Sequence, residues 1–133
     1  MSTSSEILKI EHLSWSIPDG AEVIRDLDLS LQSGKLIAVT GPNGGGKTSL
    51  AKLIAGLAQP SSGRILLNGA DITALDITQR ARLGIAFAFQ QPVRFKGLTV
   101  RDLLELAAGG RLTDGELCAL LGKVGLCANE YIH

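Results

Sequence analysis

The sequence has little of what marks membrane, secreted or nucleic-acid-binding proteins. Its 133 residues contain no apolar run near the roughly 18 residues of a membrane-spanning helix. Basic and acidic residues number 13 each, so no excess of positive charge predicts a nucleic-acid partner. The N-terminal residues 1–6 have neither the basic nor the apolar region of a signal peptide. These absences favour a cytoplasmic protein.

Cysteine is scarce as well. Cys118 and Cys127 are too far apart for a C-x-x-C pair and have no second pair, which argues against a zinc or redox site. A hydrophobic content of 45% with 20% charged residues is typical of a folded globular chain. At this length, one domain with a buried core is expected.

Glycine, in contrast, is abundant, and several of the 16 glycines gather at residues 41–48. This segment reads Gly41-Pro42-Asn43-Gly44-Gly45-Gly46-Lys47-Thr48. It matches G-x-x-x-x-G-K-S/T, the P-loop, in which a glycine-rich turn brings main-chain N–H groups around a polyphosphate. The motif predicts that Lys47 reaches the β and γ phosphates and that the Thr48 hydroxyl binds Mg²⁺. The alternative is a glycine-rich turn with a surface lysine.

The flanking sequence supplies the strand and helix that this motif requires. Residues 36–40 are a short apolar run rich in β-formers and predict a strand. Leu50, Leu53, Ile54 and Leu57 follow at the spacing of one helix face. The positive end of that helix, which begins near Lys47, is expected to face the phosphates.

Two alternating segments precede the loop. Leu13, Trp15 and Ile17 alternate with serines, and after the turn residues 18–20 a second alternation covers residues 26–32. The sequence therefore predicts an antiparallel hairpin before the P-loop. Many P-loop enzymes begin directly with the P-loop strand instead.

Beyond the first helix the pattern changes from strands to helices. Residues 64–67 predict a strand that ends in the turn Asn68-Gly69, and the alternation at residues 85–89 predicts another just before Gln90. Capping-box pairs predict three helices: Asp76 with Gln79, Thr99 with Asp102, and Thr113 with Glu116. Gly109-Gly110 and Gly125 are expected to end the last two of them.

With the early hairpin, the P-loop and the strand before Gln90 taken together, the chain resembles the ATP-binding cassette (ABC) ATPases. The residues that carry the resemblance are the early hairpin, 41–50, Ile54-Ala55-Gly56-Leu57, Pro60-Ser61-Ser62-Gly63, 63–65, Asn68-Gly69, Asp71-Ile72 and Phe89-Gln90. The resemblance implies an α/β fold of the P-loop NTPase, ABC type, and an incomplete domain. Its expected parts are an antiparallel β subdomain at 1–34, a P-loop core at 35–92 and the start of a helical subdomain at 93–133.

The resemblance also assigns roles to individual residues. It implies that ATP phosphates bind at Gly41, Pro42, Asn43, Gly44, Gly45, Gly46, Lys47, Thr48 and Ser49. Gln90 would contact Mg²⁺ and the attacking water, and would act in catalysis together with Lys47. The family often stacks adenine on a tyrosine, but the matching position here is Ile17, with Trp15 on the same face. The family's frequent serine at the fifth loop position is Gly45, whose N–H can still bind phosphate.

Three motifs of a complete ABC ATPase do not occur in the 133 residues: the Leu-Ser-Gly-Gly-Gln-like signature, an Asp-Glu Walker B strand and a switch histidine. Residues 106–110 lack the serine of the signature and are expected to end a helix. His133 follows no Walker B strand, and His12 lies in the first predicted strand. Because hydrolysis needs groups that position water and neutralise charge, the chain alone is expected to bind ATP without hydrolysing it efficiently.

The sequence indicates the family more narrowly than the subfamily. Residues 84–93 look most like the Suf-type ATPases (SufC) of iron–sulfur cluster assembly, which implies soluble Suf scaffold partners. A second reading is the ATP-binding subunit of a membrane transporter, located peripherally on a membrane subunit. In both, the complete protein is expected to form a homodimer around the nucleotide. A third reading is a non-catalytic nucleotide-binding module.

Overall fold

The computed structural model describes residues 5–126 and divides into two compact units. The first unit runs to Ala88 and the second begins at Phe89. The expected boundaries at residues 34 and 92 stay a prediction. The sheet of the first unit, however, takes strands from both sides of residue 34.

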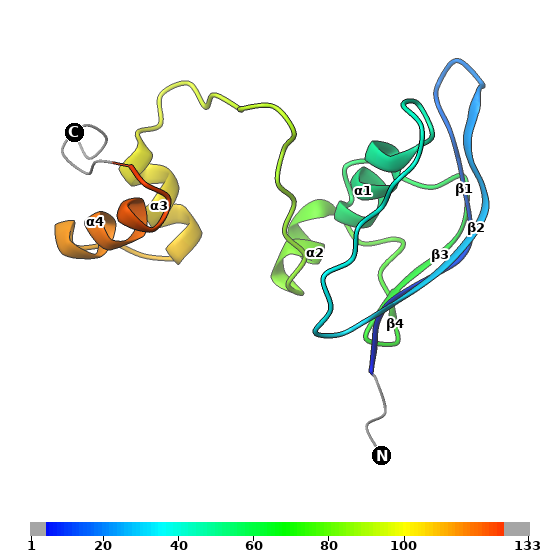
Figure 1. Cartoon of the computed structure of the whole chain (residues 1–133), viewed down its shortest axis with the longest axis horizontal. Helices are drawn as coiled ribbons and strands as arrows, with labels where there is room; N and C mark the ends of the chain where they lie inside the picture. The colour runs from blue at the N-terminus through cyan, green and yellow to red at the C-terminus, as the bar shows by residue number, and fades with distance from the viewer. Residues whose placement is uncertain (1–4, 127–133) are drawn as a thin grey trace. The chain divides into compact units, whose positions relative to one another are not determined.

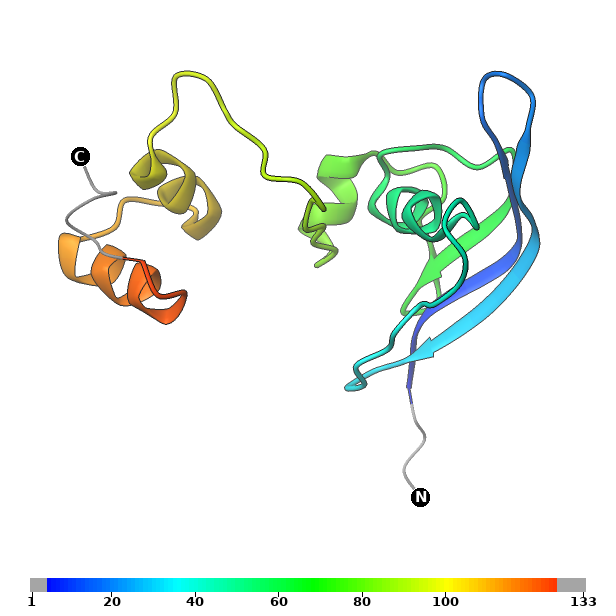
Figure 2. The same ribbon diagram turned by 45° about the horizontal axis from the view of Figure 1, so that its top comes forward.

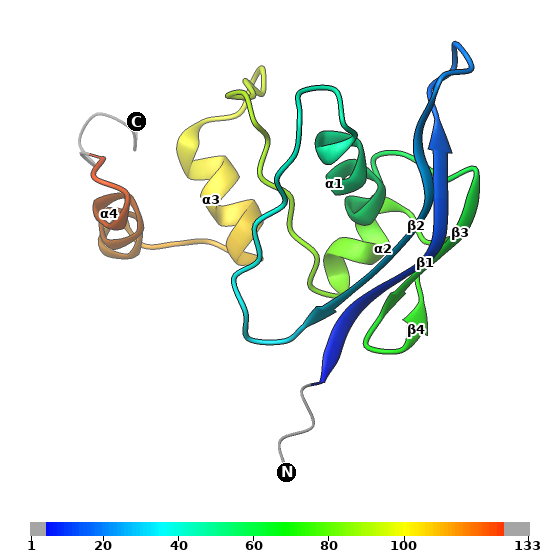
Figure 3. The same ribbon diagram turned by 45° about the vertical axis from the view of Figure 1, so that its right-hand side comes forward.

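The first unit is built on a four-stranded antiparallel sheet. Its strands are β1 (Glu6–Ser16), β2 (Glu22–Gln32), β3 (Ser62–Leu67) and β4 (Ala70–Asp71), in the order β2-β1-β3-β4. The predicted hairpin is confirmed, because β1 and β2 pair directly and the Ile17 N–H donates to the Ala21 carbonyl at 2.9 Å to close the turn. Helices α1 (Lys47–Ala55) and α2 (Ile77–Arg82) lie on one face of this sheet (Figures 1, 2 and 3).

Both hairpin strands are longer than the sequence pattern predicts, because each contains an irregularity that breaks the two-residue period. In β1 the buried residues are Leu8, Ile10 and then Leu13, and His12 has a positive φ of 49°. In β2 a similar step of three residues follows Ile24, where Asp26 has a φ of 43°. The bulges let residues three apart face the same side of the sheet.

The core of the first unit lies between this sheet and α1. Its buried members are Leu8, Ile10, Leu13, Ile24, Leu50, Leu53, Ile65 and Ile72. The predicted helix face is confirmed at Leu50 and Leu53, which are buried, whereas Leu57 lies beyond the helix end and is exposed. The apolar stripe of α1 thus holds the helix that follows the P-loop against the sheet.

The β3–β4 turn and α2 agree with their sequence signals. Asn68 and Gly69 both have positive φ, at 50° and 81°, as a tight hairpin turn requires. The Asp76 carboxylate accepts from the Gln79 N–H at 2.7 Å, and the Gln79 side chain accepts from the Asp76 N–H at 3.0 Å. The capping box of α2 is therefore complete.

Two predicted strands do not form. Residues 36–40 and 85–89 are irregular, and Leu36, Val39 and Phe89 are exposed. Apolar alternation favours a strand only where a neighbouring strand supplies hydrogen-bond partners. Within residues 5–126 the sheet consists of the four antiparallel strands, and neither segment is one of them.

The second unit contains α3 (Val100–Ala108) and α4 (Asp114–Lys123), each with the predicted capping box. Gly109 ends α3 with a φ of 76°. Past α4, Gly125 has a φ of 75°, and the Leu126 N–H donates back to the Leu121 carbonyl at 3.0 Å. Both predicted glycine terminators are therefore confirmed.

Candidate functional site

The P-loop is a turn that depends on left-handed glycine. Gly44 and Gly46 have φ values of 80° and 89°, a region that other residues rarely adopt. The Gly45 N–H donates to the Pro42 carbonyl at 3.1 Å and closes the turn. A Cβ on Gly46 would lie 3.2 Å from Cγ1 of Val23, so the loop also packs closely on β2.

Helix α1 begins directly at the end of this loop. Gly46 is its N-cap and provides no side-chain hydrogen bond, while its carbonyl accepts from the Leu50 N–H at 2.8 Å. The first-turn N–H groups of Lys47, Thr48 and Ser49 have no partner within a helix by geometry. With the positive end of the helix dipole, they form an arrangement that suits an anion.

Lys47 folds back across the loop. Its Nζ donates to the Gly41 carbonyl and, at 3.2 Å, to the Pro42 carbonyl. The ammonium group is thus held at the loop by neutral acceptors. A phosphate oxygen carries a full negative charge and would form the stronger, charge-assisted bond.

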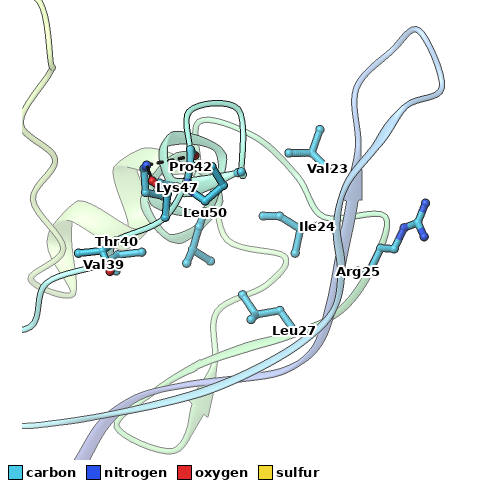
Figure 4. A pocket seen from close by; sticks show the side chains of 12 residues that line it. Val23, Ile24, Arg25, Leu27, Val39, Thr40, Pro42, Lys47 and Leu50 are labelled. Atoms are coloured by element: carbon cyan, nitrogen blue, oxygen red, sulfur yellow. Dashed lines mark hydrogen bonds between the residues drawn. The ribbon is translucent and has the colours of Figure 1, made fainter.

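A cavity of about 330 Å³ opens between the P-loop and β2 (Figure 4). One wall is made by Val23, Ile24 and Leu27, whose side chains point toward the loop in Figure 4, whereas Arg25 points away. The rest of the lining is Val39, Thr40, Gly41, Pro42, Gly45, Gly46, Lys47 and Leu50. The cavity is therefore apolar on the strand side, and its loop side carries the polar side chains of Thr40 and Lys47 among apolar residues.

The structure brings the predicted phosphate-binding residues, Gly41 through Ser49, together in one continuous loop and first helical turn. Gln90 is exposed and belongs to the second unit. Trp15 packs against the core, and Ile17 lies at the hairpin turn; neither lines the cavity. The roles of Gln90, Trp15 and Ile17 stay predictions.

Sequence reasoning missed the strand wall of the cavity. The alternation in β2 is recognisable only from Leu27 onward, because the bulge at Asp26 breaks the period just before it. The apolar pair Val23-Ile24 was the available signal. Its contact with Gly46 depends on how β2 passes the loop, which no local pattern specifies.

A separate polar cluster joins the two hairpin strands at their bulges. His12 Nδ1 lies 2.7 Å from Asp26 Oδ1 and 3.8 Å from Asp28 Oδ2. The hydrogen bond to Asp26, followed by the charge of Asp28, raises the pKa of His12 above its ordinary value. All three side chains are exposed.

Comparison with known proteins identifies the family. The model of the ABC transporter family matches residues 24–128, which is most of the chain. This chain belongs to the ABC transporter family. The predicted ABC-type cassette fold is therefore confirmed, as is the expectation of a partial domain.

Individual relatives support the same family assignment. MJ0035 of Methanocaldococcus jannaschii, named as an uncharacterized ABC transporter ATP-binding protein, is 38% identical over 102 residues, with 75% of this chain and 40% of that protein covered. The "Probable ATP-dependent transporter ycf16" of Cyanophora paradoxa is 35% identical over 123 residues, with 90% and 47% covered. The crystal structure of a nucleotide-free ATP-binding cassette from an ABC transporter superimposes with a TM-score of 0.68 at 27% identity, with 86% and 46% covered.

The cassette spans less than half the length of these three relatives. Between residues 5 and 126, none of the helices combines the length and the apolar character needed to cross a membrane.

Proposed function

We propose that this ABC cassette binds ATP at Gly41–Thr48 and that the whole protein hydrolyses ATP as the ATP-binding subunit of a transporter. The main support for the ATP site is the geometry of the first turn of α1. Its N-cap is a left-handed glycine without a side-chain cap, and the Lys47 ammonium lies over the same loop. Main-chain donors and a lysine ammonium are the components with which P-loops hold the phosphates of a triphosphate.

Magnesium fits the donors available. Thr48 lies in the first turn of α1 and offers a hydroxyl oxygen, a hard ligand of the kind Mg²⁺ prefers. The resemblance to ABC ATPases implies the amide oxygen of Gln90 as a second ligand, and phosphate oxygens and water would complete the set. Bound Mg²⁺ would neutralise charge on the β and γ phosphates.

The wording of the relatives' names favours the transporter reading. Two of the proteins named above are described as ATP-binding or ATP-dependent transporter proteins, and a third relative is named as the sulfate/thiosulfate import ATP-binding protein CysA of Synechococcus elongatus. We therefore propose membrane transporter subunits as partners, a cytoplasmic location at the membrane surface, and a homodimer of complete cassettes. The catalytic half of the reaction requires the signature and Walker B motifs, so residues 1–133 alone should bind ATP and hydrolyse it poorly.

A second candidate is a Suf-type role in iron–sulfur cluster assembly. It is favoured by one observation, the resemblance of residues 84–93. The two candidates differ in the partner. Affinity purification of the whole protein should recover integral membrane subunits in the transporter case and soluble scaffold proteins in the Suf case.

The ATP site is tested by ligand-dependent stability. At Mg-ATP a hundredfold above its Kd, binding should stabilise the fold by about 2.7 kcal/mol, visible as a rise in Tm. Lys47→Ala should abolish this rise. Lys52→Ala is the matched control, because Lys52 is exposed on the same helix but in its last turn. No rise in the unmodified chain, or equal rises in both variants, would contradict the proposed function.

A further inference from the structure

Arg80 of α2 is the most deeply buried charged residue in the part of the chain that the structure describes, with 0% of its surface exposed. Its acceptors are four main-chain carbonyls and no carboxylate. Nε donates to Leu75 at 3.0 Å, Nη2 to Thr73 at 2.9 Å, and Nη1 to Leu53 at 2.5 Å and Ile54 at 3.2 Å. A buried cation is costly unless its donors are satisfied, and here each of the three guanidinium nitrogens donates to at least one carbonyl.

Two of these carbonyls belong to the last turn of α1, the helix whose first turn follows the P-loop. The final carbonyls of a helix have no partner within it and carry the negative end of the dipole. Arg80 therefore closes the C-terminal end of α1 from another element. Gly56 makes the approach possible, since a Cβ there would lie 3.2 Å from both Arg80 Cδ and Ile77 Cα.

The remaining contacts of α1 constrain it differently. Leu50, Leu53 and Ala55 bury its apolar face, and such contacts are non-directional. They hold the helix on the sheet but tolerate small shifts along its axis. Hydrogen bonds from a rigid guanidinium depend on distance and angle, so they resist such a shift. Because the helix is nine residues long, roughly 13 Å at 1.5 Å per residue, a displacement at its end also moves its first turn.

We propose that Arg80 is a positioning residue for phosphate binding. By anchoring the C-terminal end of α1 it sets where the N–H groups of the P-loop and first helical turn stand, although it does not touch the nucleotide. This inference rests on the proposed ATP site. A purely structural Arg80 would contribute to stability alone and leave the affinity of the folded protein unchanged.

The test separates affinity from stability. Arg80→Met keeps an unbranched side chain without the fork, and Arg80→Lys keeps the charge without the planar geometry. Arg82→Met is the matched control, because Arg82 lies on the same helix and is exposed. Kd for Mg-ATP and for inorganic tripolyphosphate is measured by calorimetry at a temperature where circular dichroism shows each variant folded. NMR records the amide shifts of Gly44 and Gly46 without ligand.

We expect both Arg80 variants to raise both Kd values by about tenfold and to shift the two glycine amides, with Arg82→Met unchanged. If Arg80→Met does not fold, Arg80→Lys alone decides the question. Wild-type affinity in folded Arg80 variants, or an equal loss in Arg82→Met, overturns the positioning role while the ATP site stands. If the unmodified chain binds neither ligand, the proposed function fails and the positioning role with it.

Discussion

Gly46 offers a quantitative test of how the P-loop is built. It is left-handed, with φ of 89°, and an added Cβ would lie 3.2 to 3.3 Å from side-chain atoms of Val23 and Ile24. Gly44 has nearly the same φ of 80°, but a Cβ there would meet nothing within 4 Å. The pair therefore separates the cost of the backbone conformation from the cost of packing.

Gly44→Ala should cost about 1–2 kcal/mol of unfolding free energy, the penalty of a left-handed non-glycine residue. Gly46→Ala should add the penalty of overpacking, about 1–3 kcal/mol, for a total of roughly 2–5 kcal/mol. Urea denaturation followed by circular dichroism measures both variants under the same conditions. The variant with the larger loss should also bind Mg-ATP more weakly, because the loop must move away from β2.

A double-mutant cycle identifies the contact responsible. Val23→Ala removes the nearest side-chain atom, so Val23→Ala combined with Gly46→Ala should recover part of the loss, with a coupling of about 0.5–3 kcal/mol. The same Val23→Ala change combined with Gly44→Ala should be additive. Equal losses for Gly44→Ala and Gly46→Ala, or no coupling to Val23, would refute the packing of the loop on β2.

Two further predictions concern the N-terminal cap of α3 and the polar cluster of His12, Asp26 and Asp28. Thr99→Ala should lower the stability of the second unit by about 1 kcal/mol, because the side-chain cap of α3 is lost, whereas Thr99→Ser should keep the cap. Thermal unfolding followed by circular dichroism at 222 nm measures both variants. Equal losses of stability in Thr99→Ala and Thr99→Ser would contradict the cap. The pKa of His12 is raised by Asp26, so the stabilisation from the pair should be fully present below the unfolded pKa of about 6.5 and be lost as pH rises through the folded pKa. Asp26→Asn should lower the pKa of His12 in an NMR titration, whereas Asp19→Asn, at the hairpin turn, should not; an unchanged value in Asp26→Asn would contradict the pairing.

Local chemistry determined much of this cassette. The P-loop glycines, the three capping boxes, the Asn68-Gly69 turn and the glycine helix ends were readable in sequence, because each depends on residues within a few positions of one another. The same applies to the proposed phosphate donors, because they are consecutive main-chain groups within one motif. How that motif is placed depends on its packing against β2 and on the contacts of α1 with α2.

Tertiary structure decided the features that depend on distant partners. The alternation at residues 36–40 and 85–89 predicts strands, yet a strand depends on hydrogen bonds to a neighbouring strand, and the sheet described within residues 5–126 includes neither segment. The bulges at His12 and Asp26 interrupt the two-residue period, so the apolar alternation predicts only part of each hairpin strand. Arg80 and Arg82 are equivalent in sequence, and only the approach of α2 to the end of α1 buries one guanidinium and leaves the other exposed.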